Sequence, residues 1–133
     1  MTQRLLALLG LVVLVYQVIA TIPNGTNPAL AQPLQVGTMV ASFYGYGDSF
    51  HGRKTASGER FDRNALTAAH KDLPLGTVLQ VGRIDRSQWV VVRINDRGPY
   101  VKGRDLDLSY DAAHAIGIVR AGVKRVRYIV LHQ

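Results

Sequence analysis

Short segments rich in β-forming residues alternate with glycine- and proline-containing turns along most of this 133-residue chain. Many short strands joined by such turns, with one small helix, favour a closed β-barrel with crossing connections. The fold class predicted from the pattern is therefore mainly β. The predicted strands lie at residues 39–44, 77–81, 89–96, 105–108 and 123–131, with a segment at 64–70 that fits either a short strand or a helical turn.

The first 31 residues have the layout of an export signal. Arg4 supplies a positive charge, residues 5–22 are almost entirely apolar, and Ala29-Leu30-Ala31 is the small-x-small pattern that signal peptidase reads. An uncleaved membrane anchor is the alternative, because the apolar run is slightly long. The predicted organisation is a signal peptide at 1–31, a short leader at 32–37 and one barrel domain at 38–133.

The exported part is basic and contains no cysteine. Of 16 Lys and Arg residues only Arg4 precedes residue 32, which leaves 15 against 9 Asp and Glu and a net charge of +6. Without disulfides a small domain must rely on its core, and without a signal-peptide cysteine we expect no lipid attachment. A basic exported domain suggests an anionic partner such as a cell-wall polymer. We do not predict nucleic acid as a partner, because the cations are scattered.

Asp96 ends an almost unbroken apolar strand and opens the turn Arg97-Gly98-Pro99. Simple alternation places its side chain on the same face as Val90, Val92 and Ile94. Low polarity there would disfavour the charged form of a carboxyl, which suits a group that donates a proton near neutral pH. The alternative interpretation is a turn residue that bonds its own backbone or pairs with Arg97.

Seven short motifs follow one another in the predicted domain: ASFYG at 41–45, FHGRKTASGE at 50–59, FD at 61–62, LTAAH at 66–70, LPLGT at 73–77, NDRGP at 95–99 and DLS at 107–109. In this order they resemble the RlpA-like family, known as rare lipoprotein A or endolytic peptidoglycan transglycosylase. The resemblance implies a six-stranded double-psi β-barrel with one or two short helices, a fold shared with expansins and some endoglucanases. It also implies lytic cleavage of the MurNAc–GlcNAc bond of peptidoglycan, preferably in glycan without stem peptides. The groove residues that it implies are Glu59, Asp62, His70 and Asp96.

Lytic cleavage needs few acids, because the 6-hydroxyl of MurNAc attacks its own anomeric carbon and leaves a 1,6-anhydro end. One group can protonate the leaving oxygen and later remove the hydroxyl proton, and Asp96 is the candidate. His70 is expected to hold the Asp96 carboxyl or to stabilise the departing oxygen, unless it is a surface or capping residue. Glu59 and Asp62 are expected to position substrate or to act on Asp96 by like charge, with proton donation by Glu59 a weaker option; solvated loop acids are the alternative.

Aromatic and cationic side chains gather in the glycine-rich loop after the first strand and in the turn after Asp96. Aromatic faces stack on sugar rings, and cations bind the lactyl carboxylate of MurNAc. Barrel packing and solvated charges are the alternatives. The predicted substrate-binding residues are Tyr44, Tyr46, Phe50 and Tyr100 together with Arg53, Lys54 and Arg97.

Two other classes of function stay open. One is a non-catalytic, expansin-like wall-binding module, and the other is an inverting glycosidase in which Asp62 and Asp96 flank a water. No spacing of His51, His70 and Asp96 supports a metal site, so we predict neither metal nor cofactor. The expected partner is the peptidoglycan glycan strand. The protein is expected to be a monomer of the periplasm or cell envelope, without stable membrane insertion after signal cleavage.

Overall fold

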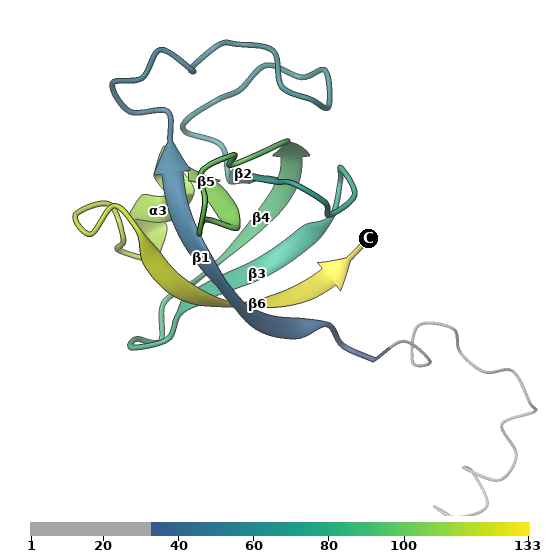
Figure 1. Cartoon of the computed structure of the whole chain (residues 1–133), viewed down its shortest axis with the longest axis vertical. Coiled ribbons are helices and arrows are strands. Elements are labelled where there is room, and N and C mark those ends of the chain that lie inside the picture. Colours follow the sequence, from purple (N-terminus) through teal and green to yellow (C-terminus); the bar gives the residue numbers. More distant parts are fainter. Residues whose placement is uncertain (1–32) are drawn as a thin grey trace, which may run out of the picture. The chain divides into compact units, whose positions relative to one another are not determined.

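The computed structural model describes residues 33–133, which form six β-strands and one short α-helix. The strands close into a barrel in the order β1-β5-β2-β4-β3-β6 (Figure 1). This confirms the predicted mainly-β, six-stranded closed barrel. The predicted signal peptide lies outside the described residues, and the first strand already begins within the predicted leader. The elements are β1 Val36–Tyr44, β2 Thr67–His70, β3 Val78–Arg83, β4 Trp89–Asp96, β5 Leu106–Ser109, α3 Tyr110–Ala115 and β6 Lys124–His132.

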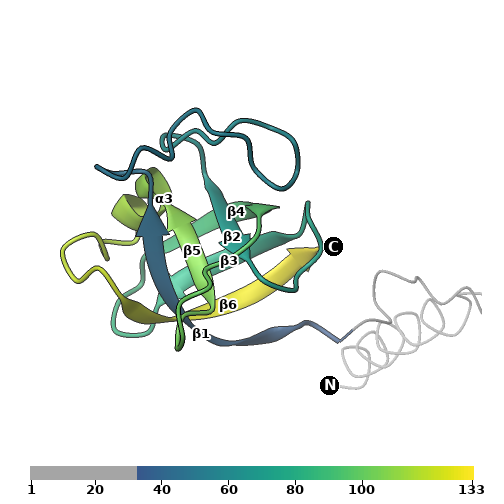
Figure 2. The same cartoon turned by 45° about the horizontal axis from the view of Figure 1, so that its top comes forward.

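Two of the six strand pairs are parallel, and both depend on connections that cross the barrel. β1 pairs with β5 and β2 pairs with β4 in parallel, while the other four neighbouring pairs are antiparallel. Figure 2 shows β5 seated between β1 and β2, although residues 45–66 separate those two strands in the sequence. Strands that pair in parallel need long connections. Residues 45–66, between β1 and β2, are the longest connection between described strands and carry candidate site residues.

The core is made by the alternate residues that the pattern assigned to one face. Val90, Val92 and Ile94 are almost completely buried in β4, and Leu79 and Val81 are fully buried in β3. They form one apolar cluster with residues of the other strands and of α3. Because a closed barrel leaves no unpaired strand edge, this cluster is enclosed without disulfides.

Within the ambiguous segment at 64–70 only Thr67–His70 forms a strand, after a turn, and small residues explain why this strand fits. β2 lies between β4 and β5, and Ala68 faces the core opposite Ile94 and Leu108 with no exposed surface. A larger side chain there would meet both neighbours. The predicted helix is also present: the Ser109 hydroxyl accepts a hydrogen bond from Ala112 N at the start of α3.

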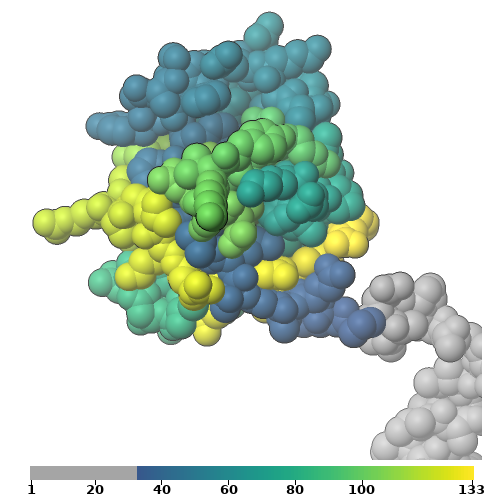
Figure 3. Space-filling model, viewed as in Figure 1, coloured from purple at the N-terminus to yellow at the C-terminus, as the bar shows by residue number. Residues whose placement is uncertain are grey.

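The long loop between β1 and β2 is an ordered structure with its own hydrogen bonds. Gly52 N donates to Phe61 O at 2.8 Å, and Phe61 N donates to Arg53 O at 2.7 Å. The Phe61 ring is buried and stacks on Tyr44, with ring centroids 4.1 Å apart. In the space-filling view this loop forms the upper edge of the barrel domain, with the segment that follows β4 (green) beneath it (Figure 3). Within residues 33–133 no helix is long and apolar enough to span a bilayer.

Candidate active site

Four residues from four neighbouring strands lie in one row on the face that points away from the core. Strand register pairs Ser42 with Asp107, Asp107 with Ala69, and Ala69 with Asp96. Paired residues share a face of the sheet, and the residues directly before Ser42, Asp107 and Ala69 in their strands, Ala41, Leu106 and Ala68, are core residues. The row therefore brings two carboxyl groups to one surface, with only the small Ala69 between them.

The position of Asp96 in this row corrects the sequence-based expectation. Ala68 pairs with Ile94, but the next residue, Ala69, pairs with Asp96, so Asn95 is an extra residue in β4. This bulge breaks the alternation: Asn95 is 2% exposed, and Asp96 faces the side of Ala69 and not the side of Ile94. Simple alternation predicted that Asp96 shares the face of the apolar residues, and the bulge makes this prediction wrong.

The Asp96 carboxylate is held by backbone donors. Its Oδ1 accepts hydrogen bonds from Ala56 N at 3.0 Å and from Arg97 N at 2.9 Å. The first of these bonds joins β4 to the long loop, 40 positions away in the sequence. Two N–H donors on one oxygen fix the orientation of the Asp96 carboxyl group at the end of β4.

Asp107 is the acid that sequence reasoning left without a role. Its Oδ1 accepts a hydrogen bond from Ser42 Oγ at 2.8 Å. Burial raises the pKa of Asp107, the hydroxyl of Ser42 and the charge of Arg104 oppose this, and the charges of Asp48 and Asp96 add to it. The alternation of Asp105, Leu106, Asp107 and Leu108 was the signal that could have placed Asp107 on the face opposite the core.

Tyr44 carries a buried hydroxyl beside the two acids. Tyr44 is only 8% exposed, and its hydroxyl lies beside the Asp96 carboxyl without a well-aligned hydrogen bond to it. Burial raises the pKa of the Tyr44 phenol far above its usual range, and the charges of Asp96 and Asp107 and the approach to the Asp96 carboxyl raise it further. The phenol therefore stays protonated and can donate its O–H to Asp96 or to a bound ligand.

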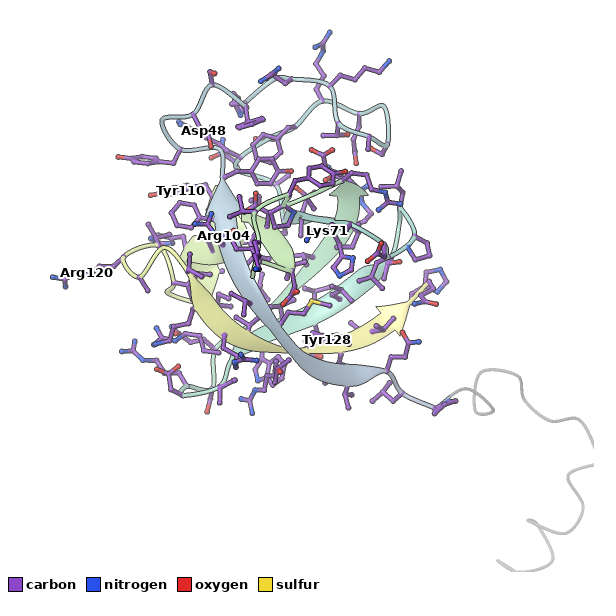
Figure 4. The ribbon with its side chains drawn as sticks, viewed as in Figure 1. Asp48, Lys71, Arg104, Tyr110, Arg120 and Tyr128 are labelled. Atoms are coloured by element: carbon purple, nitrogen blue, oxygen red, sulfur yellow. The ribbon has the colours of Figure 1, made fainter. Side chains whose placement is uncertain are left out.

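These groups line a cavity of about 430 Å³ between the row of strands, the long loop and the turn after β4. Figure 4 shows Asp48 on the loop above the end of β1. Seven predicted site residues contribute to the lining: Tyr44, Phe50, Arg53, Lys54, Asp96, Arg97 and Tyr100. The remaining lining residues are Phe61, Ala69, Gly98, Pro99, Val101 and Asp107.

His70 does not make the contact with Asp96 that we expected. Its Nδ1 accepts hydrogen bonds from Asp72 N and Leu73 N, both at 3.0 Å, and so closes the turn after β2. Successive residues of a strand point to opposite faces, and His70 pairs with the core residue Leu106, whereas Ala69 lies in the row with Asp96. Burial lowers the pKa of His70, which keeps the ring neutral and Nδ1 free to accept.

Glu59 also lies outside the residues that line the cavity. It forms a two-point ion pair with Arg93 of β4, Oε1 to Nη1 at 2.6 Å and Oε2 to Nη2 at 3.1 Å. The hydrogen bonds from Arg93 lower the pKa of Glu59, which opposes a role as proton donor. The pair anchors the end of the long loop to β4.

Asp62 and Tyr46 are likewise absent from the lining. Asp62 Oδ1 accepts a bond from Asn64 N at 2.9 Å, the geometry of a turn residue. Tyr46 is 65% exposed and stacks on Tyr110, with ring centroids 5.0 Å apart. Arg97 lines the cavity, but its Nη1 donates to the carbonyl oxygens of His70 and Leu73.

Comparison with known proteins agrees with this architecture. Residues 37–128 match the family model described as lytic transglycolase. The chain is 46% identical over 115 residues to "Probable endolytic peptidoglycan transglycosylase RlpA" of Nostoc, covering 81% of this chain and 31% of that protein. It is 49% identical over 92 residues to "Endolytic peptidoglycan transglycosylase RlpA" of Campylobacter jejuni, covering 69% of this chain and 33% of that protein. The chain thus spans about a third of the length of these relatives.

Solved structures share the fold at low sequence identity. A mutant expansin of Clavibacter michiganensis in complex with cellohexaose is 19% identical, with a TM-score of 0.58 over 74% of this chain and 51% of that chain. The Streptomyces papain inhibitor gives 19% identity and a TM-score of 0.56, covering 74% of this chain and 96% of that chain. The matched family model, the curated relatives and the closed six-stranded barrel agree: the chain belongs to the lytic transglycolase family and has its double-psi β-barrel fold.

Proposed function

We propose that this protein is an endolytic lytic transglycosylase that cleaves MurNAc–GlcNAc bonds of peptidoglycan and forms 1,6-anhydroMurNAc ends. One observation carries the proposal: the cavity brings the Asp96 carboxylate, fixed by two backbone N–H groups, next to aromatic side chains suited to sugar rings. The names of the curated relatives support it, and an expansin with this fold has been solved with cellohexaose.

In this mechanism Asp96 receives the proton of the MurNAc 6-hydroxyl as that oxygen attacks the anomeric carbon. No water needs to be activated in this step, because the hydroxyl of the sugar itself is the nucleophile. Phe50 and Tyr100, which are exposed in the cavity lining, offer ring faces to the sugars, and the buried Tyr44 offers its hydroxyl. Arg53 and Lys54 at its rim meet the lactyl carboxylate, which is free in glycan without stem peptides.

The place of action is part of the same proposal. Residues 1–31 read as an export signal, so we propose that the mature protein begins at Gln32 and acts as a monomer in the cell envelope, without a lipid anchor. The mass of the protein recovered from the native periplasm measures this directly. A species that retains Met1 would instead indicate a membrane anchor.

Product analysis tests the activity. Purified protein incubated with peptide-free glycan is expected to release fragments with anhydro ends, identified by mass spectrometry. Reducing ends would indicate a glycosidase, and binding without products would indicate an expansin-like module.

The matching variant is Asp96→Asn, which keeps the size of the side chain and an oxygen that accepts from Ala56 N. We expect cleavage to fall at least about 100-fold, because the amide cannot take up the proton. Thermal unfolding of the same preparation is the control for folding. Cleavage at wild-type rate by the folded variant would remove Asp96 from the mechanism.

A further inference from the structure

The proposed mechanism needs a proton at the departing GlcNAc oxygen, and it assigns Asp96 to the proton of the MurNAc 6-hydroxyl. Asp96 Oδ1 already accepts hydrogen bonds from two backbone N–H groups, which fix this carboxyl group in place. A second acid in the same cavity is therefore required if the two proton transfers are divided. Such a division is the usual arrangement when two carboxyl groups lie in different environments.

We propose that Asp107 is the proton donor to the leaving oxygen, and that Asp96 is the proton acceptor on the other side of the same bond. This assignment rests on the proposed function. The geometry that carries it is the row Asp107–Ala69–Asp96, in which both carboxyls line one cavity and are two strand spacings apart, about 10 Å between Cα atoms. Ala69 has the side chain of a single methyl group and leaves space between the acids for the bond to be cleaved.

The environment of Asp107 differs from that of Asp96 in a way that fits a donor. Asp107 has one hydroxyl as hydrogen-bond donor, from Ser42, and burial shifts its pKa upward. The neighbouring Tyr44 is more than nine-tenths buried, and its hydroxyl lies beside Asp96 in the same lining. A buried hydroxyl close to two carboxyl groups makes this corner of the cavity polar, which suits the hydroxyl groups of a sugar.

Several charged groups act on the titration of Asp107. The carboxylates of Asp48 and Asp96 hold the proton on, and the guanidinium of Arg104, seen beside β1 in Figure 4, favours its release. The other charged groups that share the cavity are Arg53, Lys54 and Arg97. The proton acceptor Asp96 thus helps to keep the donor protonated, so the two roles support each other before the reaction.

The bond between the anomeric carbon of MurNAc and the GlcNAc oxygen breaks, and its electron pair stays on that oxygen. The Asp107 proton binds to the same oxygen. The 6-oxygen of MurNAc bonds to the anomeric carbon, and its proton passes to Asp96. The enzyme is then left with neutral Asp96 and charged Asp107, and proton exchange with solvent restores the starting state. No proton is gained or lost over the cycle, as expected for a lyase.

The test combines Asp107→Asn with two substrates. The amide is the same size and still accepts from Ser42 Oγ, so the fold should persist. On peptide-free glycan we expect a loss of at least about 100-fold, since general acid catalysis contributes this much. On a 4-nitrophenyl glycoside of a GlcNAc–MurNAc oligomer, whose leaving group needs no proton, the variant should stay within about tenfold of wild type. Asp96→Asn should lose activity on both substrates.

A matched control and a pH profile separate chemistry from structure. Asp105→Asn changes an exposed carboxyl two residues away that accepts from Val40 N, a bond that the amide oxygen can keep. This variant should cleave glycan at the wild-type rate. In Ser42→Ala the hydroxyl that stabilises charged Asp107 is gone, so its pKa rises further and the alkaline limb of the pH–rate curve should move to higher pH.

Each outcome bears on one of the two proposals. Glycan cleavage by Asp107→Asn within threefold of wild type would overturn the donor assignment and leave the proposed function in place. Equal losses on both substrates, with an alkaline limb that Ser42→Ala does not move, would reduce Asp107 to a structural residue. Wild-type protein that releases neither anhydro fragments nor nitrophenol would overturn the proposed function, and the donor assignment with it.

Discussion

A single extra residue in β4, Asn95, turns the Asp96 carboxyl away from the core and into the cavity. The bulge has a cost, because Asn95 Oδ1 is buried without a partner among the described residues. In return, Asn95 O accepts a bond from Ser57 N at 3.0 Å, next to the Ala56 bond to Asp96. Bulges often aim a side chain at a functional site, and here the same bulge also attaches the long loop.

His70 is a residue whose protonation should affect folding more than chemistry. Because burial lowers its pKa in the folded protein below the ordinary value of about 6.5, the unfolded state binds more protons as the pH falls. The stabilisation by neutral His70 is therefore complete above about pH 6.5 and is lost as the pH falls through the folded-state pKa. In His70→Asn the amide oxygen can still accept from Asp72 N without titrating.

We therefore expect the melting temperature of His70→Asn to fall less between pH 7.5 and 5 than that of wild type, by a few degrees. Scanning calorimetry at both pH values measures this. The exposed His132, changed to Asn, is the control and should leave the pH dependence as in wild type. Parallel curves for wild type and His70→Asn would show that the turn does not sense the His70 proton.

Changing Glu59 tests whether it anchors the long loop to β4 or takes part in glycan cleavage. Both partners of the Glu59–Arg93 pair are about half exposed, so Glu59→Gln should cost no more than about 1 kcal/mol of stability. Its local effect should be faster tryptic cleavage in the loop that contains Arg53 and Lys54, with glycan cleavage still within about tenfold of wild type. Arg93→Gln should behave in the same way. Loss of cleavage as complete as in Asp96→Asn would instead make Glu59 a candidate catalytic acid again.

At the scale of elements, one residue joins a strand, a helix and the segment before β2. Ser109 ends β5, and its hydroxyl caps α3 through Ala112 N at 3.3 Å. The same hydroxyl donates to Ala65 O at 2.6 Å, and Thr67 N approaches it at 3.4 Å. Because these partners come from segments 42 and 44 positions away, the cap also fixes where β2 enters the barrel.

Ser109→Ala is expected to destabilise the barrel by about 1–2 kcal/mol, the usual cost of a lost N-cap with a buried acceptor left unpaired. Urea unfolding measures the change. Ser87→Ala, in an exposed turn, is the matched control and should stay within about 0.5 kcal/mol of wild type. Equal stability of the two variants would mean that water or a backbone shift replaces the cap.

At the scale of the whole molecule, residues 32–133 carry a net charge of +6, which would attract the carboxylates of the proposed glycan substrate. Electrostatic steering raises association rates by about 10-fold or more at low salt, and screening removes it within a Debye length of about 8 Å at physiological salt. Three cations at the cavity, Arg53, Lys54 and Arg97, place part of this charge where the glycan would bind.

We expect kcat/KM on peptide-free glycan to fall about tenfold between 20 and 300 mM NaCl. Binding of a neutral chito-oligosaccharide, which has no lactyl carboxylate, should change little over the same range. Fluorescence titration of the neutral ligand provides the comparison. The same salt dependence for both ligands would locate the effect in the protein and not in the carboxylates of the substrate.

Local patterns in the sequence determined much of this protein. Alternation with period two predicted the strands and their core residues, and small residues allowed 67–70 to form a strand. The Ser109 cap and the position of Asp96 at the end of β4 could also be predicted, because capping and turns depend on neighbours a few residues away. Seven of the eleven candidate residues line the cavity.

Only the tertiary structure decided which acids lie in the same cavity and which groups surround each of them. The bulge at Asn95 depends on the register of β2 against β4, which no period within one strand records. Asp107 accepts its hydrogen bond from Ser42, 65 positions away in the sequence, and Glu59 pairs with Arg93, 34 positions away. The charge of a carboxyl is set by burial and by the groups around it, and in a barrel with crossing connections those groups come from distant parts of the chain.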